Sequence, residues 1–292
     1  MDILTNTKNP LVSIITPSFN RADFLEQTII SVLEQDYPNI EYIVLDDGST
    51  DNTTEILKKY EGQIEWKRHE NMGEQRTVNL GFKMTKGDYV CVVNSDDPLY
   101  PGAIQKLVQA LQENIDAIAA YPDWNEIDSL SNVTRTIKLP IYDIREMLVS
   151  LDVSIGPGLL IRRKSIKQIE IRDTSLKYAG DLALYFQLAL IGRLIHIPEP
   201  LATHRIHANA ASTTGKGKEM ADQLVKVIFN SLSHPNLPSD LWRQRFKIYY
   251  RIHYHAAKNY CGKDIRAKIK HYFLSFFWRF PDFFVRKFLD EL

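Results

Sequence analysis

Two pairs of adjacent aspartates follow apolar runs in the first hundred residues of the chain. Asp46-Asp47 comes directly after the run 42–45, and Asp96-Asp97 comes shortly after the run 90–93. Apolar runs of this length indicate buried strands, and open α/β sheets bind ligands beyond the carboxyl ends of their strands. Carboxylates suit a divalent cation whose coordination is completed by phosphate oxygens. A lone Asp-Asp is common in loops, but two such pairs in one half of the chain indicate a binding site.

A third group of short polar residues lies at the end of the first apolar run, 11–16. The segment Thr16-Pro17-Ser18-Phe19-Asn20-Arg21 would lie beside Asp46-Asp47 if the two strands are neighbours. Such residues can hydrogen-bond a base and a ribose. The chain has no G-x-G-x-x-G after the first strand and no P-loop, so the nucleotide is not held as in dinucleotide enzymes or ATPases. The alternative is ordinary turn chemistry, because the same residue types form turns.

The pattern of the first 121 residues predicts strands that alternate with helices. This alternation is typical of βαβ units and a mostly parallel sheet. From about 122 the alternation fades: 123–139 is polar and predicts a loop or hairpin, and the chain from 221 onward is helical in pattern. The expected strands are 11–16 (stopped by Pro17), 42–45, 64–67, 89–93, 117–121 and 194–197, and the expected helices are 23–35, one ending at 60, 74–84, 101–112 and 182–191.

The composition narrows the class of protein. The chain has 292 residues, with 36 Lys plus Arg against 36 Asp plus Glu, so no overall positive field favours nucleic acid as a partner. Two cysteines are too few for a disulfide framework or a cysteine zinc site and fit a reducing compartment. The first ten residues lack a signal-peptide pattern, and no apolar run reaches the ~20 residues of a membrane span. We therefore expect a cytoplasmic protein.

The order and spacing of these motifs resemble the family 2 glycosyltransferases with the GT-A fold. The resemblance is strong over 11–121 and recognisable to about 212. It implies an α/β GT-A domain over 1–215, with a nucleotide-sugar-binding half (11–121) and an acceptor-binding half (122–215), followed by a helical region over 216–292. The matching segments are 12–20 (VSIITPSFN), 33–37 (LEQDY), 46–51 (DDGSTD), 71–73 (NMG), 79–81 (NLG), 86–89 (KGDY) and 94–97 (NSDD).

The resemblance assigns nucleotide-binding roles to five residues. It implies that Thr16 and Asp47 contact the base and that Pro17 shapes the pocket. Asp96 is expected on the ribose and phosphate side. Arg76, in the helix after 71–73, is expected to reach the base or the phosphates. The small residues Thr16 and Asp47 leave room for one ring, which favours a uridine diphosphate sugar as donor.

The resemblance also implies a metal ion at Asp97, either Mg²⁺ or Mn²⁺, bridging the donor diphosphate. The diphosphate leaving group gains negative charge as the glycosidic bond breaks, and a metal ion stabilises that charge. Asn94 departs from the family pattern, which often has a third acidic residue at this position. The substitution lowers the local negative charge but keeps a hydrogen-bond acceptor.

An inverting transferase needs a base to deprotonate the acceptor hydroxyl. In the family this carboxylate begins a helix after the acceptor region, and Asp181 matches that position. Gly180 stands where the family often has a second acidic residue. The alternative is that Asp181 only caps the helix, a position that aspartate favours.

The segment His204-Arg205-Ile206-His207 resembles the family's arginine-x-histidine segment beside the diphosphate. Arg205 and His207 are therefore expected on the diphosphate side, although His204 replaces the family's usual aromatic residue. The alternative is a solvated loop. The histidines and aspartates here do not have the spacing of a zinc site.

The function expected from the resemblance is inverting, metal-dependent sugar transfer from a nucleotide-diphosphate sugar to an acceptor hydroxyl in cell-surface polysaccharide synthesis. The acceptor would be a glycan or a lipid-linked glycan at the inner face of the membrane. Two rivals stay open: a nucleotidyltransferase that makes the nucleotide sugar, and a non-catalytic module that binds sugar or nucleotide. A base at Asp181 would exclude the second rival, because a binding module has no use for one.

The C-terminal region combines aromatic and basic residues over 263–288. A basic aromatic helix can lie in a membrane interface, which would make the protein a peripheral membrane protein. The same pattern fits a helix that packs on the core or pairs with a second copy in a homo-oligomer. The sequence does not separate these alternatives.

Overall fold

The computed structural model describes residues 9–151, 153–166, 170–208 and 217–279. The chain divides into two compact units built from interleaved segments. The sheet unit comprises Met1–Ile141, Ser154–Thr174 and Gly192–His207, and the helical unit comprises Tyr142–Val153, Ser175–Ile191 and Ala208–Leu292. The segments 142–153 and 175–191, which precede the expected boundary at 215, thus belong to the helical unit.

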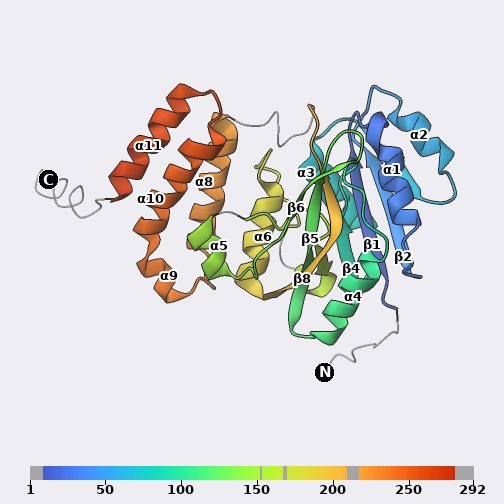
Figure 1. The fold of residues 1–292 in the computed structure, drawn as a ribbon, viewed down its shortest axis with the longest axis horizontal. Coiled ribbons are helices and arrows are strands. Elements are labelled where there is room, and N and C mark those ends of the chain that lie inside the picture. The colour runs from blue at the N-terminus through green and yellow to red at the C-terminus, as the bar shows by residue number, and fades with distance from the viewer. Residues whose placement is uncertain (1–8, 152, 167–169, 209–216, 280–292) are drawn as a thin grey trace, which may run out of the picture. The chain divides into compact units, whose positions relative to one another are not determined.

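The sheet unit is built on one mixed sheet (Figure 1). Its described strands follow the order β3-β2-β1-β4-β7-β5-β6, with β8 also paired to β5. The first four strands in this order are parallel to one another. Strand β7 pairs antiparallel with both β4 and β5, β6 pairs antiparallel with β5, and β8 runs parallel to β5. The strands are β1 (Val12–Ser18), β2 (Ile40–Asp46), β3 (Glu65–Arg68), β4 (Tyr89–Val92), β5 (Ala117–Ile127), β6 (Val133–Ile137), β7 (Leu160–Arg162) and β8 (Arg193–Arg205).

Helices connect the parallel strands and cover the sheet. Strand β1 is buried over its whole length, as expected for a strand with helices on both faces. Helix α4 buries a stripe at the spacing of an amphipathic helix, which includes Ile104, Leu107 and Leu111. The helices of this unit are α1 (Ala22–Leu33), α2 (Thr53–Lys59), α3 (Glu74–Met84) and α4 (Ala103–Glu113).

The helical unit packs its own helices around a separate core. Within this core, Nδ1 of His253 lies 3.0 Å from Nδ1 of His271. Burial, and the repulsion that a protonated His271 would exert, lower the pKa of His253 to about 4. Burial also lowers the pKa of His271, so the pair is neutral at neutral pH. The helices of the unit are α5 (Ile144–Ser150), α6 (Gly180–Ile191), α8 (Lys218–Leu232), α9 (Ser239–Arg243), α10 (Arg245–His255), a π-helical turn at Ala256–Tyr260, and α11 (Ile265–Arg279).

The structure confirms the α/β fold class, and β1, β5 and β8 each continue at least two residues past the carboxyl end that the sequence predicts. Strand β1 continues through Pro17 because β4 pairs with β1 only as far as Ile15, so the missing N–H of Pro17 breaks no ladder. Strand β5 continues to Ile127 and forms a hairpin with β6, which selects the hairpin over the loop for 123–139. Strand β8 extends to Arg205, so His204 and Arg205 are strand residues.

No helix within the described ranges has both the length and the apolar character required to span a membrane.

Candidate active site

The carboxyl ends of β1 and β2 meet at one edge of the sheet. Ser18 and Asp46 are in register, and the carbonyl oxygen of Ser18 accepts a hydrogen bond of 2.8 Å from the backbone N–H of Asp47. The sequence prediction that these two polar segments are neighbours is therefore confirmed. This edge is where ligands bind in open α/β sheets.

Asp46 shapes the turn after β2. Its carboxylate is fully buried, and Oδ1 accepts a hydrogen bond from the backbone N–H of Ser49 at 2.8 Å. Oδ2 accepts a hydrogen bond from the hydroxyl of Thr54 at 3.0 Å and lies 3.4 Å from Nε of Arg68. Because its two oxygens accept hydrogen bonds from Ser49 and Thr54, Asp46 fixes the conformation of the turn between β2 and α2.

Asp47 joins the end of β2 to the segment that leads into α3. Its Oδ1 accepts from the backbone N–H of Met72 at 2.7 Å, and its Oδ2 accepts from that of Gly73 at 2.9 Å. The side chain of Asp47 is nearly fully buried. Arg76, in the first turn of α3, is exposed. The spacing between 46–51 and 71–73 in the sequence thus reflects a direct contact between the two motifs.

Thr16 and Pro17 lie inside the sheet. Both are buried, and the Thr16 hydroxyl lies 3.2 Å from the hydroxyl of Tyr42. Burial raises the pKa of Tyr42, so its hydroxyl keeps its proton and is available for this hydrogen bond.

Gly48 lets the turn approach the segment before α3. It has a φ of +77°, and a Cβ at this position would lie 2.8 Å from the backbone nitrogen of Asn71. We predict that Gly48→Ala destabilises the protein more than Gly62→Ala does. Gly62 also has a positive φ, +85°, but a Cβ there meets nothing within 4 Å. The control should cost about 1–2 kcal/mol for the left-handed backbone alone, and Gly48→Ala should cost more because the backbone must also shift. Equal urea midpoints for the two variants would contradict the close approach.

Asp97 ties the loop after β4 to strand β8. Its Oδ1 accepts from the backbone N–H of Arg205 at 2.8 Å, and its Oδ2 accepts from Nδ2 of Asn94 at 3.0 Å. Nδ1 of His204 also lies 3.5 Å from Oδ2. Asp97 is 1% exposed. Both oxygens therefore have protein donors, and Asn94 serves as a donor here.

Asp96 is the more accessible carboxylate of the pair, with 14% of its side chain exposed. Its Oδ2 lies 3.2 Å from Nε of Arg21 and 3.0 Å from Nε2 of His207. Oδ1 has no hydrogen-bond donor among the residues that the structure describes. The ring of His207 packs against Phe24 at a centroid distance of 4.7 Å. The structure thus brings together two predicted site residues that are 111 positions apart in sequence. It adds Arg21, the last residue of the polar segment after the first strand, to which the sequence assigned no individual role.

Arg205 is buried beneath the Asp96-Asp97 loop and hydrogen-bonds its backbone. It is 1% exposed, and its guanidinium donates to the backbone oxygens of Asp96 (3.0 Å) and Asp128 (2.8 Å) and to Oε1 of Gln27 (2.6 Å). Its Cζ lies 4.8 Å from the centroid of the Phe24 ring. Burial lowers the pKa of Arg205, while the charges of Asp97, Asp96 and Asp128 oppose that shift. In this arrangement Arg205 positions the loop that carries Asp96.

His204 lies beside Asp97 on β8, half-buried. Burial alone would lower the pKa of His204, but the hydrogen bond to Asp97 and the charges of Asp97, Asp96 and Glu126 outweigh it, and the net pKa is raised. The ring also meets that of Trp124 edge-on at 5.7 Å. Three side chains on β8 and just beyond it, those of His204, Arg205 and His207, thus converge on the Asp96-Asp97 loop.

The sequence of this loop and of the strand ends matches a known family model. The model described as glycosyl transferase family 2 matches residues 13–170, which is more than half of the chain. This chain belongs to glycosyl transferase family 2. The family assignment decides for a glycosyltransferase over a nucleotidyltransferase.

Two curated relatives show how far the likeness extends. An uncharacterized glycosyltransferase of Rickettsia typhi is 34% identical to this glycosyltransferase over 220 residues, which cover 72% of this chain and 68% of that one. A putative teichuronic acid biosynthesis glycosyltransferase of Bacillus subtilis, TuaG, is 40% identical over 115 residues, which cover 38% of this chain and 45% of that one.

Solved structures at low sequence identity share the fold of this glycosyltransferase. Residues 1–349 of S. aureus TarS, in complex with UDP-GlcNAc, match with a TM-score of 0.67 at 15% identity and cover 92% of this chain and 91% of that one. A mannosyltransferase of Pyrobaculum calidifontis, in complex with GDP-Man and Mn²⁺, matches with a TM-score of 0.60 at 17% identity, over 91% and 74% of the two chains. The GT-A fold expected from the sequence is confirmed.

Asp181 belongs to the helical unit of this glycosyltransferase. It lies in the first turn of α6, it is exposed, and its Oδ1 accepts a hydrogen bond of 2.7 Å from the backbone N–H of Leu182. Helix α6 begins at Gly180, the residue that replaces the family's second carboxylate. A carboxylate at the start of a helix is stabilised by the helix dipole. The role of Asp181 stays a prediction from the resemblance.

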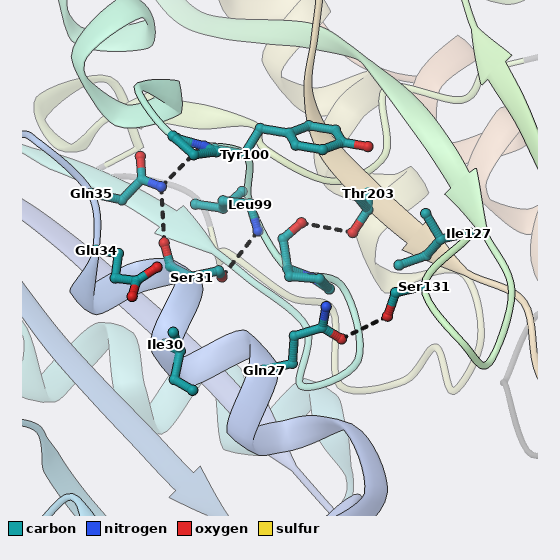
Figure 2. A pocket seen from close by; sticks show the side chains of 12 residues that line it. Gln27, Ile30, Ser31, Glu34, Gln35, Leu99, Tyr100, Ile127, Ser131 and Thr203 are labelled. Atoms are coloured by element: carbon teal, nitrogen blue, oxygen red, sulfur yellow. Dashed lines mark hydrogen bonds between the residues drawn. The ribbon is translucent and has the colours of Figure 1, made fainter. Parts of the chain in front are cut away.

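A pocket of about 330 Å³ lies beside the segment Pro98–Pro101, directly after the Asp96-Asp97 pair (Figure 2). In its lining, Ser31 Oγ accepts from the backbone N–H of Leu99 at 3.1 Å, and the Thr203 hydroxyl donates to the backbone oxygen of Pro98 at 2.7 Å. Gln27, which bonds Arg205, also lines it (Figure 2). These contacts from α1 and β8 hold the segment that follows the acidic loop.

Proposed function

We propose that this glycosyltransferase moves a hexosyl group from a nucleotide-diphosphate sugar to an acceptor hydroxyl, with inversion at the anomeric carbon. The observation that carries the proposal is the convergence of Arg21 and His207 on Asp96, in the loop after β4, the strand that pairs in parallel with β1. Membership of family 2 and the nucleotide sugars bound by the two similar structures support it.

The residues of this loop fit a divalent cation. A carboxylate suits Mg²⁺ or Mn²⁺, whereas an imidazole is a transition-metal ligand, so the pair Asp96 and His207 favours Mn²⁺. No group of three or more acidic, histidine or cysteine side chains within the described ranges is arranged to hold a metal ion, so phosphate oxygens of the donor and water would complete the coordination. A cation held there would stabilise the charge that develops on the leaving diphosphate.

We propose Asp96 and His207 as the metal ligands in place of Asp97, to which the sequence analysis assigned the ion. Asp97 has both oxygens occupied by Arg205 and Asn94, whereas Oδ1 of Asp96 is available within the described part of the chain. Asp97 would then hold the loop in shape. The assignment of the ion to Asp97 stays a prediction. The variants Asp96→Asn and Asp97→Asn distinguish it from the assignment to Asp96 and His207.

The remaining roles follow from the placement of the side chains. We propose that Pro17 and Asp47 shape the base pocket and that Arg76 reaches the nucleotide. Thr16 would support the pocket from the core side, because its hydroxyl is directed to Tyr42. Arg205 would position Asp96 without touching the diphosphate, and Asp181 would take the proton of the acceptor hydroxyl.

The proposed identity of the acceptor rests only on the similarity of this chain to other glycosyltransferases. We propose a glycan or lipid-linked glycan of a cell-surface polysaccharide, used at the cytoplasmic face of the membrane, with 122–215 as the acceptor-binding half. The likeness to TuaG, a putative teichuronic acid biosynthesis enzyme, supports a polysaccharide.

A donor-hydrolysis assay across UDP-, GDP- and dTDP-sugars with Mn²⁺ tests the proposed reaction. We expect sugar release from at least one donor, with loss of that activity in EDTA. Release that is identical with Mn²⁺ and with EDTA would contradict the metal requirement. No release and no nucleotide binding for any donor would contradict the function.

We predict that UDP raises the melting temperature of the full chain more than GDP does, in the presence of Mn²⁺. The reason is that the small side chains at the ends of β1 and β2 leave room for one ring. dTDP, with the same kind of ring, should raise the melting temperature more than GDP as well. A larger shift with GDP would overturn the preference for a pyrimidine.

A further inference from the structure

Helix α11 of the helical unit exposes a stripe of large apolar side chains. Ile269 and Phe273 are 63% and 65% exposed, and Ile265 and Tyr272 are exposed with them. The spacing i, i+4, i+7 and i+8 places these four residues on one face of the helix. Phe276, at i+11, continues the same face and is also exposed.

The opposite face of α11 is the one that packs in the helical unit. Ala267, His271 and Ser275 recur every four residues and are buried. The ring of Tyr272 meets that of Tyr254, an exposed residue of α10, at a centroid distance of 5.8 Å. The exposed face is therefore not the packing face of the helix, and α10 extends it.

Basic residues flank this apolar face on both sides. At about 100° per residue, Arg266 lies on one side of the stripe and Lys268 on the other. Lys263, in the turn just before the helix, adds a third positive charge near its start, and all three are at least partly exposed. The nearby acidic residue Asp264 is engaged as a cap, because its Oδ1 accepts from the backbone N–H of Ala267 at 2.9 Å.

Large exposed apolar patches mark interaction sites, and the charge around this one favours an anionic partner over a second copy of the chain. A symmetric dimer through this face would bring the basic flanks of two copies together. An interfacial helix, in contrast, places its aromatic and aliphatic side chains at the acyl boundary and its Lys and Arg among anionic headgroups. Tyrosine side chains such as Tyr254 and Tyr272 are typical of that boundary.

We propose that the face of α11 formed by Ile265, Ile269, Tyr272 and Phe273, together with Tyr254, binds the surface of an anionic lipid bilayer. The helix lies in the plane of the interface. This inference rests on the geometry of the helical unit and holds whether or not the proposed reaction is right. Of the alternatives that the sequence left open for the C-terminal region, the proposal takes up the membrane interface.

Vesicle flotation with the full chain tests the proposal. The probes are vesicles of phosphatidylcholine alone and of phosphatidylcholine with phosphatidylglycerol in equal parts. We expect binding to the mixed vesicles that weakens in high salt. The double variant Ile269→Ser/Phe273→Ser should lower the partition coefficient by at least about tenfold, because two large apolar side chains no longer enter the interface. Arg266→Ala should lower it about fivefold, the factor that ~1 kcal/mol per basic residue corresponds to.

Two control variants test whether any loss of vesicle binding is specific to α11. Ile115→Ser removes an exposed apolar residue, and Lys83→Glu reverses an exposed charge, both in the sheet unit. Neither should change flotation, and all variants should keep the circular dichroism and melting temperature of the parent. If the full chain does not float with the mixed vesicles, the proposal is overturned. A dimer in sedimentation that Ile269→Ser/Phe273→Ser dissociates would then identify a second copy as the partner, and flotation gained only by a chain ending at Arg279 would identify residues 280–292.

Discussion

Replacing Asp181 by asparagine should lower the rate of sugar transfer by roughly 10²–10⁴-fold, the usual contribution of a general base. Asparagine keeps the size of the side chain and the oxygen that accepts from the backbone N–H of Leu182, but it cannot take a proton. The melting temperature and the affinity for the nucleotide should therefore change little. Initial rates and calorimetric titration of UDP with Mn²⁺ measure the two quantities separately.

Glu219→Gln is the matched control for Asp181→Asn. Glu219 is an exposed carboxylate in the first turn of α8, another helix of the same unit. Its loss should leave transfer unchanged. If Asp181→Asn retains most of the turnover of the parent, Asp181 only caps the start of helix α6, and another residue is the general base. A non-catalytic module would show no turnover in either form.

The second large expected effect is on metal binding, and it distinguishes the proposed role of Asp96 from that of Asp97. Asp96→Asn should weaken Mn²⁺-dependent UDP binding by roughly 100-fold or more, because even the loss of an outer-shell partner costs about 10–100-fold in metal affinity. Its melting temperature should change little, since the side chain is partly exposed. Mn²⁺ binding followed by electron paramagnetic resonance, with and without UDP, reads this effect without any assay of activity.

Asp97→Asn should act on stability. Both oxygens of Asp97 accept hydrogen bonds in a buried site, and an amide would turn one acceptor into a donor that faces a donor. The expected cost is about 1–3 kcal/mol in the free energy of unfolding. If instead Asp97→Asn keeps its stability and loses Mn²⁺, while Asp96→Asn binds Mn²⁺ as the parent does, the ion belongs to Asp97.

The strands and helices of the first 121 residues were predictable because their signals are local. Continuous apolar runs mark β1, β2 and β4, and the predicted helix 74–84 coincides with α3. The first parts of the long strands β5 and β8 were predicted as 117–121 and 194–197, but their continuations were not, because those are polar or contain proline. Asp123 and Asn125 are buried in β5 only because β8 and β6 pair beside them, and no local pattern records those contacts.

The residues of the site were predictable as a set, but the role of each residue was not. The sequence singled out Asp96, Asp97, Arg205 and His207, and the structure gathers them. Which carboxylate stays accessible depends on the backbone N–H of Arg205 reaching Asp97 across 108 positions. Arg205 was expected beside the diphosphate, yet its guanidinium is directed inward to Gln27, whose helix position gave no functional signal.

Calorimetric titration of UDP into the full chain, once with Mn²⁺ and once with EDTA, tests the central claim most directly. That claim is a nucleotide diphosphate bound through a divalent ion at Asp96 and His207. The structure predicts binding with Mn²⁺ that weakens by roughly 100-fold or more in EDTA, since the loss of an outer-shell partner alone costs about 10–100-fold, and that Asp96→Asn reduces to the EDTA level. Equal affinity in the two conditions, or full Mn²⁺-dependent binding by Asp96→Asn, would contradict it.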